Sequence, residues 1–164
     1  MIQRIVRQLR EHFDEIIVTT GEATRYQDLL NGVTILEDEI KNCGPMGGLY
    51  TGLKAASNEY SFVTACDMPF LSSAFVQFLV SQIDGSTDAI VPEVGGIKCV
   101  TRAIYGKRCL NVIDKLAERK RFSLQGLSNS VEVGLITEQE LQKIDSNLRS
   151  LHGFNTRMEW GNLS

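Results

Sequence analysis

One carboxylate in the sequence follows a buried strand at a point where the chain is held stiffly. Asp67 comes directly after the most apolar run of the chain, Ser61–Cys66, and Pro69 keeps the residue before it extended. A hard carboxylate oxygen in such a place is a suitable ligand for Mg²⁺ bound together with substrate phosphates. The alternative role is a cap on the next helix, but Ser72 and Ser73 already supply that cap.

A glycine-rich segment, Gly44–Gly48, lies directly before a predicted helix at Leu49–Ser57. Gly44, Gly47 and Gly48 would let a ligand approach the backbone closely, and the free N–H groups at a helix N-terminus favour an anion. An ordinary tight connection between strand and helix explains the same glycines. Because the spacing matches neither the dinucleotide-binding fingerprint nor the P-loop pattern, it supports neither a dehydrogenase nor a P-loop NTPase.

Three further polar segments are candidates for ligand binding. The acidic run Glu37–Glu39 ends a predicted strand and places Asp38 where it can accept hydrogen bonds from a ribose or base; a solvated acidic turn is the alternative. The basic run Arg119–Arg121 offsets the C-terminal dipole of a predicted helix, and Arg121 would also suit a phosphate-bearing substrate. Asn155 can both donate to and accept from a heterocycle, or can form a turn.

Composition excludes several classes of protein. The chain has 164 residues, 17 Lys plus Arg against 20 Asp plus Glu, and a net charge of −3, so it is a poor general binder of nucleic acid. No apolar run approaches the roughly 20 residues that span a bilayer, and charges interrupt the N-terminal apolar positions, so we expect neither a membrane span nor a secretory signal. The cysteines form no C-x-x-C pair, which argues against zinc and predicts reduced thiols in a cytoplasmic protein; they are Cys43, Cys66, Cys99 and Cys109.

The elements that position these residues alternate between helical and strand periods. The apolar pattern predicts strands at 16–20, 33–36, 61–66, 88–91, 98–105 and 131–136, and helices at 2–13, 26–30, 49–57, 72–83, 110–117 and from 137. This order predicts one α/β domain over 1–164, with a mostly parallel sheet and helices on both faces. Ligands bind outside the carboxyl ends of such strands, where Asp38, Gly44 and Asp67 fall.

Two segments together resemble the molybdenum cofactor guanylyltransferase family. Gly44–Leu53 followed by Val63–Phe70 carries the paired G-P-x-G-G and C-D-M-P motifs, and Glu37–Glu39, Arg121 and Asn155 continue the match in order. The resemblance covers nearly the whole chain. It implies a Rossmann-related, GT-A-like nucleotidyltransferase fold, and transfer of GMP from GTP onto molybdopterin with release of pyrophosphate.

The resemblance also implies roles for single residues. In the family, the residue matching Asp67 binds Mg²⁺ at the GTP phosphates, and the one matching Asp38 lies on the nucleoside side. The glycines matching Gly44, Gly47 and Gly48 border the nucleotide. The residues matching Arg121 and Asn155 belong to the pterin side. The candidate assemblies are a homodimer or a complex with other proteins of molybdenum cofactor biosynthesis.

The sequence departs from the family pattern at three places. The family opens with a strand and an L-A-G-G-x-S-x-R-M-G-x-D-K segment that grips the triphosphate, whereas here no strand precedes Ile2. The family's Pro-Leu-His/Tyr-Ala is here Val100–Ala103, and its terminal Asn-x-Asn-Thr-Pro-Glu is here Gly153–Met158. We therefore expect a shortened, weakly active member whose sheet closes around a gap or is covered by a second copy.

Two alternatives to the guanylyltransferase interpretation stay open at this point. One is a non-catalytic module that binds a pterin or a partner protein and transfers nothing. The other is a related cytidylyl- or sugar-nucleotide transferase, because the paired motifs specify the group of nucleotidyltransferases better than the individual nucleotide.

Overall fold

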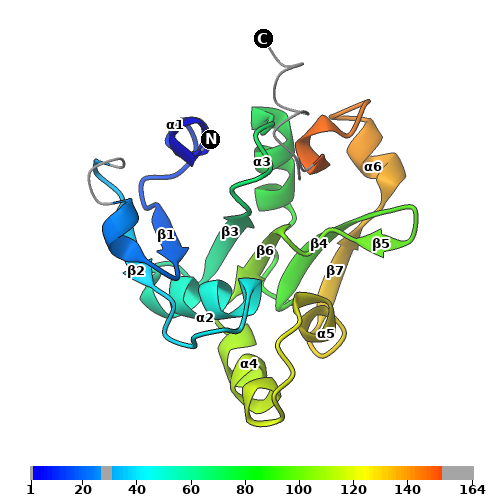
Figure 1. Ribbon diagram of the computed structural model, residues 1–164. Helices are drawn as coiled ribbons and strands as arrows, with labels where there is room; N and C mark the ends of the chain where they lie inside the picture. The colour runs from blue at the N-terminus through cyan, green and yellow to red at the C-terminus, as the bar shows by residue number, and fades with distance from the viewer. Residues whose placement is uncertain (1, 27–30, 153–164) are drawn as a thin grey trace.

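The strands form two separate sheets (Figure 1). The computed structural model describes residues 2–26 and 31–152. The smaller sheet pairs β1 (Ile17–Thr20) with β2 (Thr34–Glu37). The larger sheet has the order β3-β6-β4-β5, with β7 also paired to β4. Its strands are β3 (Tyr60–Thr64), β4 (Ala89–Val94), β5 (Ile97–Lys98), β6 (Arg102–Gly106) and β7 (Val133–Ile136).

The expected α/β class is confirmed, but the larger sheet is mixed rather than mostly parallel. The pairs β1–β2 and β4–β7 are parallel, whereas β6 runs antiparallel to both β3 and β4. The reversal begins at Gly95 and Gly96, which both have positive φ values, 56° and 75°. Two such residues form a tight hairpin turn that pairs Val94 with Ile97, so the predicted strand 98–105 divides into β5 and β6.

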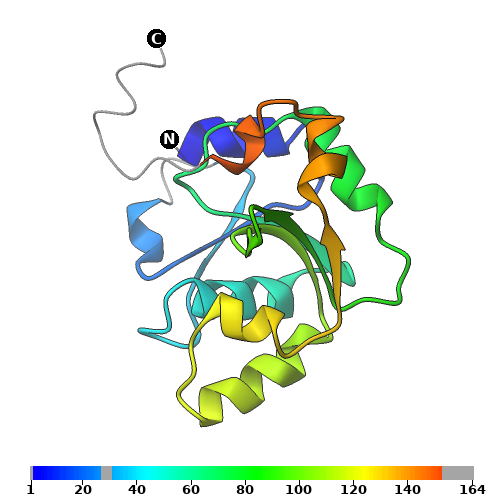
Figure 2. The ribbon, with the colours of Figure 1, turned by 90° about the vertical axis from the view of Figure 1, so that its right-hand side faces the viewer.

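Helices cover both faces of the larger sheet (Figures 1 and 2). On one face lie α2 (Pro45–Ala55), α4 (Cys109–Glu118) and α5 (Leu124–Ser128), and on the other α3 (Ser73–Ser81) and α6 (Glu138–Gln142). The remaining helical elements are α1 (Ile2–Leu9), η1 (Ala23–Arg25) and η2 (Arg149–Leu151). The predicted helix 26–30 lies largely outside the described residues. Within the described part of the chain, no helix is long and apolar enough to cross a membrane.

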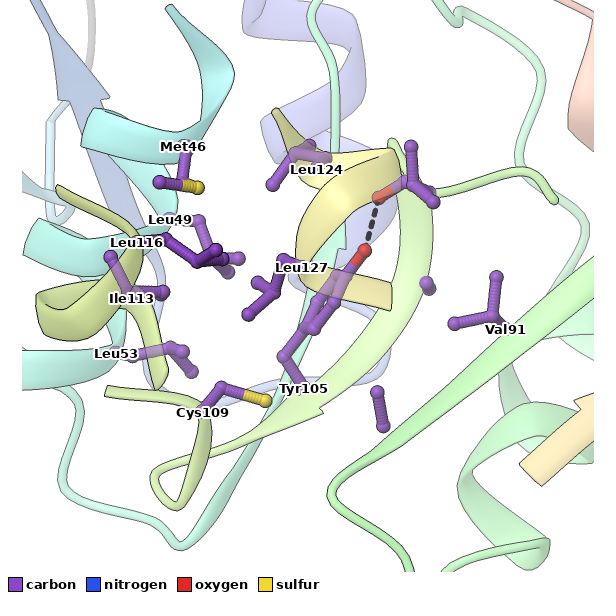
Figure 3. Packing of buried hydrophobic residues seen from close by; sticks show 13 residues of the cluster. Met46, Leu49, Leu53, Val91, Tyr105, Cys109, Ile113, Leu116, Leu124 and Leu127 are labelled. Carbon is purple, nitrogen blue, oxygen red and sulfur yellow. Dashed lines mark hydrogen bonds between the residues drawn. The ribbon is translucent and has the colours of Figure 1, made fainter. Parts of the chain in front are cut away.

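The alternation of side chains along the central strands builds two cores. Ala89 and Val91 of β4 pack with α2, α4 and α5, as Figure 3 shows, while Ile90 between them packs with α3 and α6. Tyr105 is fully buried in the first core, and its hydroxyl donates to the carbonyl of Val100 at 2.7 Å. Burial raises the pKa of the Cys109 thiol to about 12, which suits a small apolar residue in this core.

A cavity of about 440 Å³ separates the two sheets. Its walls include residues 16–19 of the β1 segment and residues 60–66 of the β3 segment, and α1 and α2 also line it. Among the described residues, β1 pairs only with β2 and β3 only with β6, so each has an unpaired edge. The sheets therefore do not close onto each other, contrary to one of the two expectations from the sequence.

Candidate functional site

Asp67 lies in a turn directly after the carboxyl end of β3. The Met68 N–H donates to the carbonyl of Ala65 at 3.4 Å, which closes the turn around Asp67. Ser72, rather than Asp67, caps α3, because its hydroxyl accepts a hydrogen bond from the Phe75 N–H at 3.0 Å. The half-buried Asp67 carboxylate accepts no hydrogen bond from any residue that the structure describes. The capping alternative is thereby removed, and the carboxylate is available to a ligand.

The acidic run after β2 separates into two paired residues and one unpaired residue. Glu39 forms an ion pair with Lys54 at 2.6 Å, and Glu37 accepts a weak hydrogen bond from the Ala23 N–H at 3.4 Å. Asp38 lines the cavity, and its Oδ1 is buried without a hydrogen-bond partner among the described residues. Burial raises the pKa of Asp38 above its usual value. An acceptor left in this state is suited to a ligand that brings its own donors.

The three glycines of the segment 44–48 differ in their surroundings. The helix α2 begins at Pro45, four residues before the predicted start, so Gly47 and Gly48 belong to its first turns. A Cβ at Gly47 would lie 2.5 Å from the Ile40 carbonyl oxygen, and one at Gly48 would lie 2.8 Å from the Thr19 hydroxyl. Only Gly44, with φ of 56°, faces open space in this set. Packing therefore explains Gly47 and Gly48, and Gly44 is the glycine free to approach a ligand.

Several of the candidate residues line the cavity between the sheets, whereas Asp67 itself is not among the lining residues. Thr19, Asp38, Gly44, Gly48 and the exposed Cys66, which precedes Asp67, line this one cavity. They come from the carboxyl-terminal ends of β1, β2 and β3 and from the N-terminus of α2. A helix N-terminus and a carboxylate at the same rim suit a phosphorylated ligand that carries a cation.

Arg121 and Asn155 are not joined to this cluster by the structure. Arg121 is exposed in the connection between α4 and α5 and does not line the cavity. Asn155 lies outside the described residues. Their assignment to the pterin side therefore stays a prediction.

Sequence reasoning missed one charged side chain at the site, Arg102. This first residue of β6 is fully buried beneath the Asp67 turn, and its guanidinium donates to the carbonyls of Met68 and Phe70. Burial lowers the pKa of Arg102 to about 10, and the nearby Asp67 carboxylate opposes that change, so the guanidinium stays charged at neutral pH. A buried position opposite Thr64 on the neighbouring strand is a tertiary property, and no local pattern indicated it.

The donor set fits a cation bound mainly through its substrate. Within residues 2–26 and 31–152, no three His, Cys, Asp or Glu side chains gather into a metal site. Asp67 provides one half-buried carboxylate. Mg²⁺ is commonly held by one or two carboxylates together with substrate phosphates, which matches this arrangement.

The chain is similar to known nucleotidyltransferases. Residues 1–132 match the family described as "MobA-like NTP transferase domain". The molybdenum cofactor guanylyltransferase of Desulfosudis oleivorans is 29% identical over 159 residues, which are 97% of this chain and 78% of that protein.

Two solved structures share the fold. Molybdopterin-guanine dinucleotide biosynthesis protein A from Archaeoglobus fulgidus superposes with a TM-score of 0.81 at 18% identity, covering 97% of this chain and 82% of that one. The 4-diphosphocytidyl-2C-methyl-D-erythritol synthase of Anaerococcus prevotii gives a TM-score of 0.64 at 11% identity, covering 96% of this chain and 82% of that one.

Proposed function

The chain belongs to the family of MobA-like NTP transferase domains, and on that premise we propose that it transfers GMP from GTP to molybdopterin. The observation that carries the proposal is its similarity, over 97% of its length, to a molybdenum cofactor guanylyltransferase. The site supports it, because the cavity is lined by the α2 N-terminus and by Asp38, whose Oδ1 has no partner among the described residues, and by Cys66, the residue before Asp67.

In the proposed reaction, GTP lies at the rim of the cavity. The Asp38 carboxylate accepts hydrogen bonds from the nucleoside, and the α2 N-terminus at Gly44 faces the phosphates. A phosphate oxygen of molybdopterin attacks the α-phosphorus of GTP. The new P–O bond forms as the bond to the β-phosphate oxygen breaks, and pyrophosphate leaves with that electron pair. We assign the pterin side to Arg121 and Asn155.

Mg²⁺ would be held by Asp67 and the phosphates. When bound there, it would supply positive charge that offsets the negative charge of the phosphates. The protein's own part is to position the carboxylate and the nucleotide, so catalysis is mostly positioning and electrostatics.

A transfer assay with GTP, molybdopterin and Mg²⁺ tests the proposal. We expect pyrophosphate and molybdopterin guanine dinucleotide to form together, and Asp67→Asn to lower the rate about 10²-fold or more because the transition-state charge loses its organised partner. Asp114→Asn, a substitution on the exposed side of α4, is the matched control and should leave the rate unchanged. Absence of product from the wild-type protein would refute the proposal.

The same assay separates the alternatives. Replacing GTP with CTP tests the alternative that the chain is a cytidylyltransferase. The A. prevotii synthase shares the fold. Binding of a pterin that depends neither on Mg²⁺ nor on the Asp67 substitution would favour a non-catalytic module.

A parallel assay of the D. oleivorans relative tests the expectation of weak activity, which an equal rate would contradict. The cytoplasmic setting predicted from the cysteine spacing stays part of this proposal.

A further inference from the structure

Arg102 makes an unusual set of contacts for a buried charge. Its Nε and Nη2 donate to the Thr64 hydroxyl at 3.1 and 2.8 Å, and Nη2 also donates to the carbonyl of Met68. Its Nη1 donates to the carbonyls of Phe70 and Ser150. A guanidinium has five N–H donors, and these contacts use every one of them. The four acceptors are neutral oxygens, so the arrangement is a set of hydrogen bonds rather than an ion pair.

The acceptors lie on both sides of Asp67 along the chain. Thr64 ends β3 three residues before the aspartate, and Met68 and Phe70 follow it. One planar, rigid group thus holds the Thr64 side chain before Asp67 and two backbone carbonyls after it. The Asp67 carboxylate lies close enough to raise the pKa of Arg102 through its charge, yet no residue in the described part of the chain donates a hydrogen bond to it.

The fourth acceptor joins a distant part of the chain to the turn. Ser150 belongs to η2, and its hydroxyl also accepts a hydrogen bond from the Ser72 N–H at 3.2 Å. Arg149 lies over the Phe70 ring, with 4.5 Å from its Cζ to the ring centre. The segment Arg149–Leu151 therefore supports the turn from the other side.

We propose that Arg102 is a positioning residue that holds the Asp67 carboxylate in the orientation needed for a cation on the nucleotide phosphates. A guanidinium is costly to bury, and an apolar side chain of similar volume often serves stability as well or better. The five bonds instead specify one conformation of the turn. The inference rests on the proposed metal-dependent nucleotide binding. It adds that the Arg102 guanidinium orients Asp67 for binding the cation.

Calorimetric titration of GTP with and without Mg²⁺ tests this role. The measured quantity is the gain in GTP affinity that Mg²⁺ provides. We expect Arg102→Met to reduce that gain about 10–100-fold, as loss of a supporting partner commonly does, while GTP affinity without metal is kept. Arg102→Lys should restore little, because an ammonium cannot span four acceptors. A gain equal to wild type in either variant would overturn the inference.

The matched control is Arg108→Met. Arg108 also donates to carbonyl oxygens, those of Gly85 and Thr87, but it follows the opposite end of β6. Its loss should leave the Mg²⁺ gain unchanged, and an equal loss there would show a general effect of removing arginine. If Arg102→Met does not fold, Thr64→Val removes the acceptor of two guanidinium donors with little change of shape. Thr64→Val should also reduce the gain in GTP affinity that Mg²⁺ provides, and an unchanged gain would contradict the inference.

Hydrogen exchange separates this inference from the proposed function. Loss of the guanidinium should speed amide exchange in the peptide 65–71 of Arg102→Met or Thr64→Val, but not in Arg108→Met. This readout needs no nucleotide. If wild-type protein shows no Mg²⁺-dependent GTP binding, the proposed function fails by itself, and exchange still decides whether Arg102 fixes the turn. Unchanged exchange in both site variants would overturn the inference.

Discussion

At the scale of single residues, chemically similar candidates have different structural roles. Of the acidic run after β2, Glu37 and Glu39 make contacts within the protein, and Asp38 retains a buried oxygen without a partner among the described residues. Of the glycines, Gly48 packs against Thr19 and Gly44 is open. Residue type identified the acidic run and the glycine segment. The contacts of each residue then distinguish candidate ligand-binding residues from packing residues.

Substitution of Gly48 tests the packing role directly. In Gly48→Ala the new Cβ would meet the Thr19 hydroxyl at 2.8 Å, and we expect a loss of about 1–3 kcal/mol in the free energy of unfolding. The control Gly52→Ala places its Cβ 3.6 Å from Thr19 and should be neutral or stabilising by up to about 1 kcal/mol. Urea unfolding measures both. Equal effects would contradict the packing explanation, whereas Thr19→Ala should rescue only Gly48→Ala.

Ionisation of Asp38 should lower the free energy of unfolding, whereas ionisation of most carboxylates in folded proteins raises it. Burial raises its pKa above the usual 3.8, so the fold is favoured while the group is protonated, and that contribution is lost as pH rises through the raised pKa. Asp38→Asn cannot ionise. We expect it to be more stable than wild type at neutral pH and equal to it below the usual pKa, while binding GTP more weakly.

Asp84→Asn is the matched control for this pH dependence. Hydrogen bonds from Ser86 lower the pKa of Asp84, which contributes stability above its usual pKa and loses it as pH falls through the lowered value. The control should therefore be less stable than wild type at neutral pH. Urea unfolding across the acidic and neutral range measures both variants. If both substitutions changed the free energy of unfolding at neutral pH in the same direction, the raised pKa of Asp38 would be contradicted.

At the scale of elements, the predicted helices and strands are present in the described part of the chain, apart from the helix 26–30, which lies largely outside it. Local chemistry sets several of their ends. Thr137 and Glu140 form the capping box that their spacing predicted. The helix α2 begins at Pro45 rather than Leu49, because proline suits the first position of a helix and needs no N–H partner there. The hairpin at Gly95 and Gly96 reverses the chain and makes the larger sheet mixed.

The start of α3 offers a test of capping. Both Ser72 and Ser73 were candidates, and the Ser72 hydroxyl accepts the Phe75 N–H. We expect Ser72→Ala to lower the free energy of unfolding by about 1 kcal/mol. Ser73→Ala, at the first helical position, should change it by only a few tenths. Thermal unfolding of the two variants checks this, and equal losses would contradict the assignment of the cap.

At the scale of the whole molecule, the cavity between the two sheets is the dominant feature. The cavity is lined by apolar side chains of α1, α2 and β3. The sheets do not close across it. Coverage by a second copy stays a prediction that the oligomeric state in solution would test.

An apolar fluorescent dye should bind in this cavity. Its enhanced emission should saturate with the protein and fall in Leu9→Gln, which makes one wall of the cavity polar. Arg7→Gln changes an exposed position on the same helix and serves as the control. A protein that remains monomeric and shows no dye binding would contradict the presence of an accessible apolar cavity.

The sequence by itself determined the α/β class, most element positions and the family, and it predicted Asp67 and Asp38 as site residues. These follow from local periodicity and from short motifs, which report the burial and chemistry of neighbouring residues. Only the tertiary structure decided that the larger sheet is mixed, that Asp38 is the unpaired acid of its run, and that Arg102 lies under the Asp67 turn. That guanidinium joins the segment from Thr64 to Met68 to the distant Ser150, and folding alone brings such positions together.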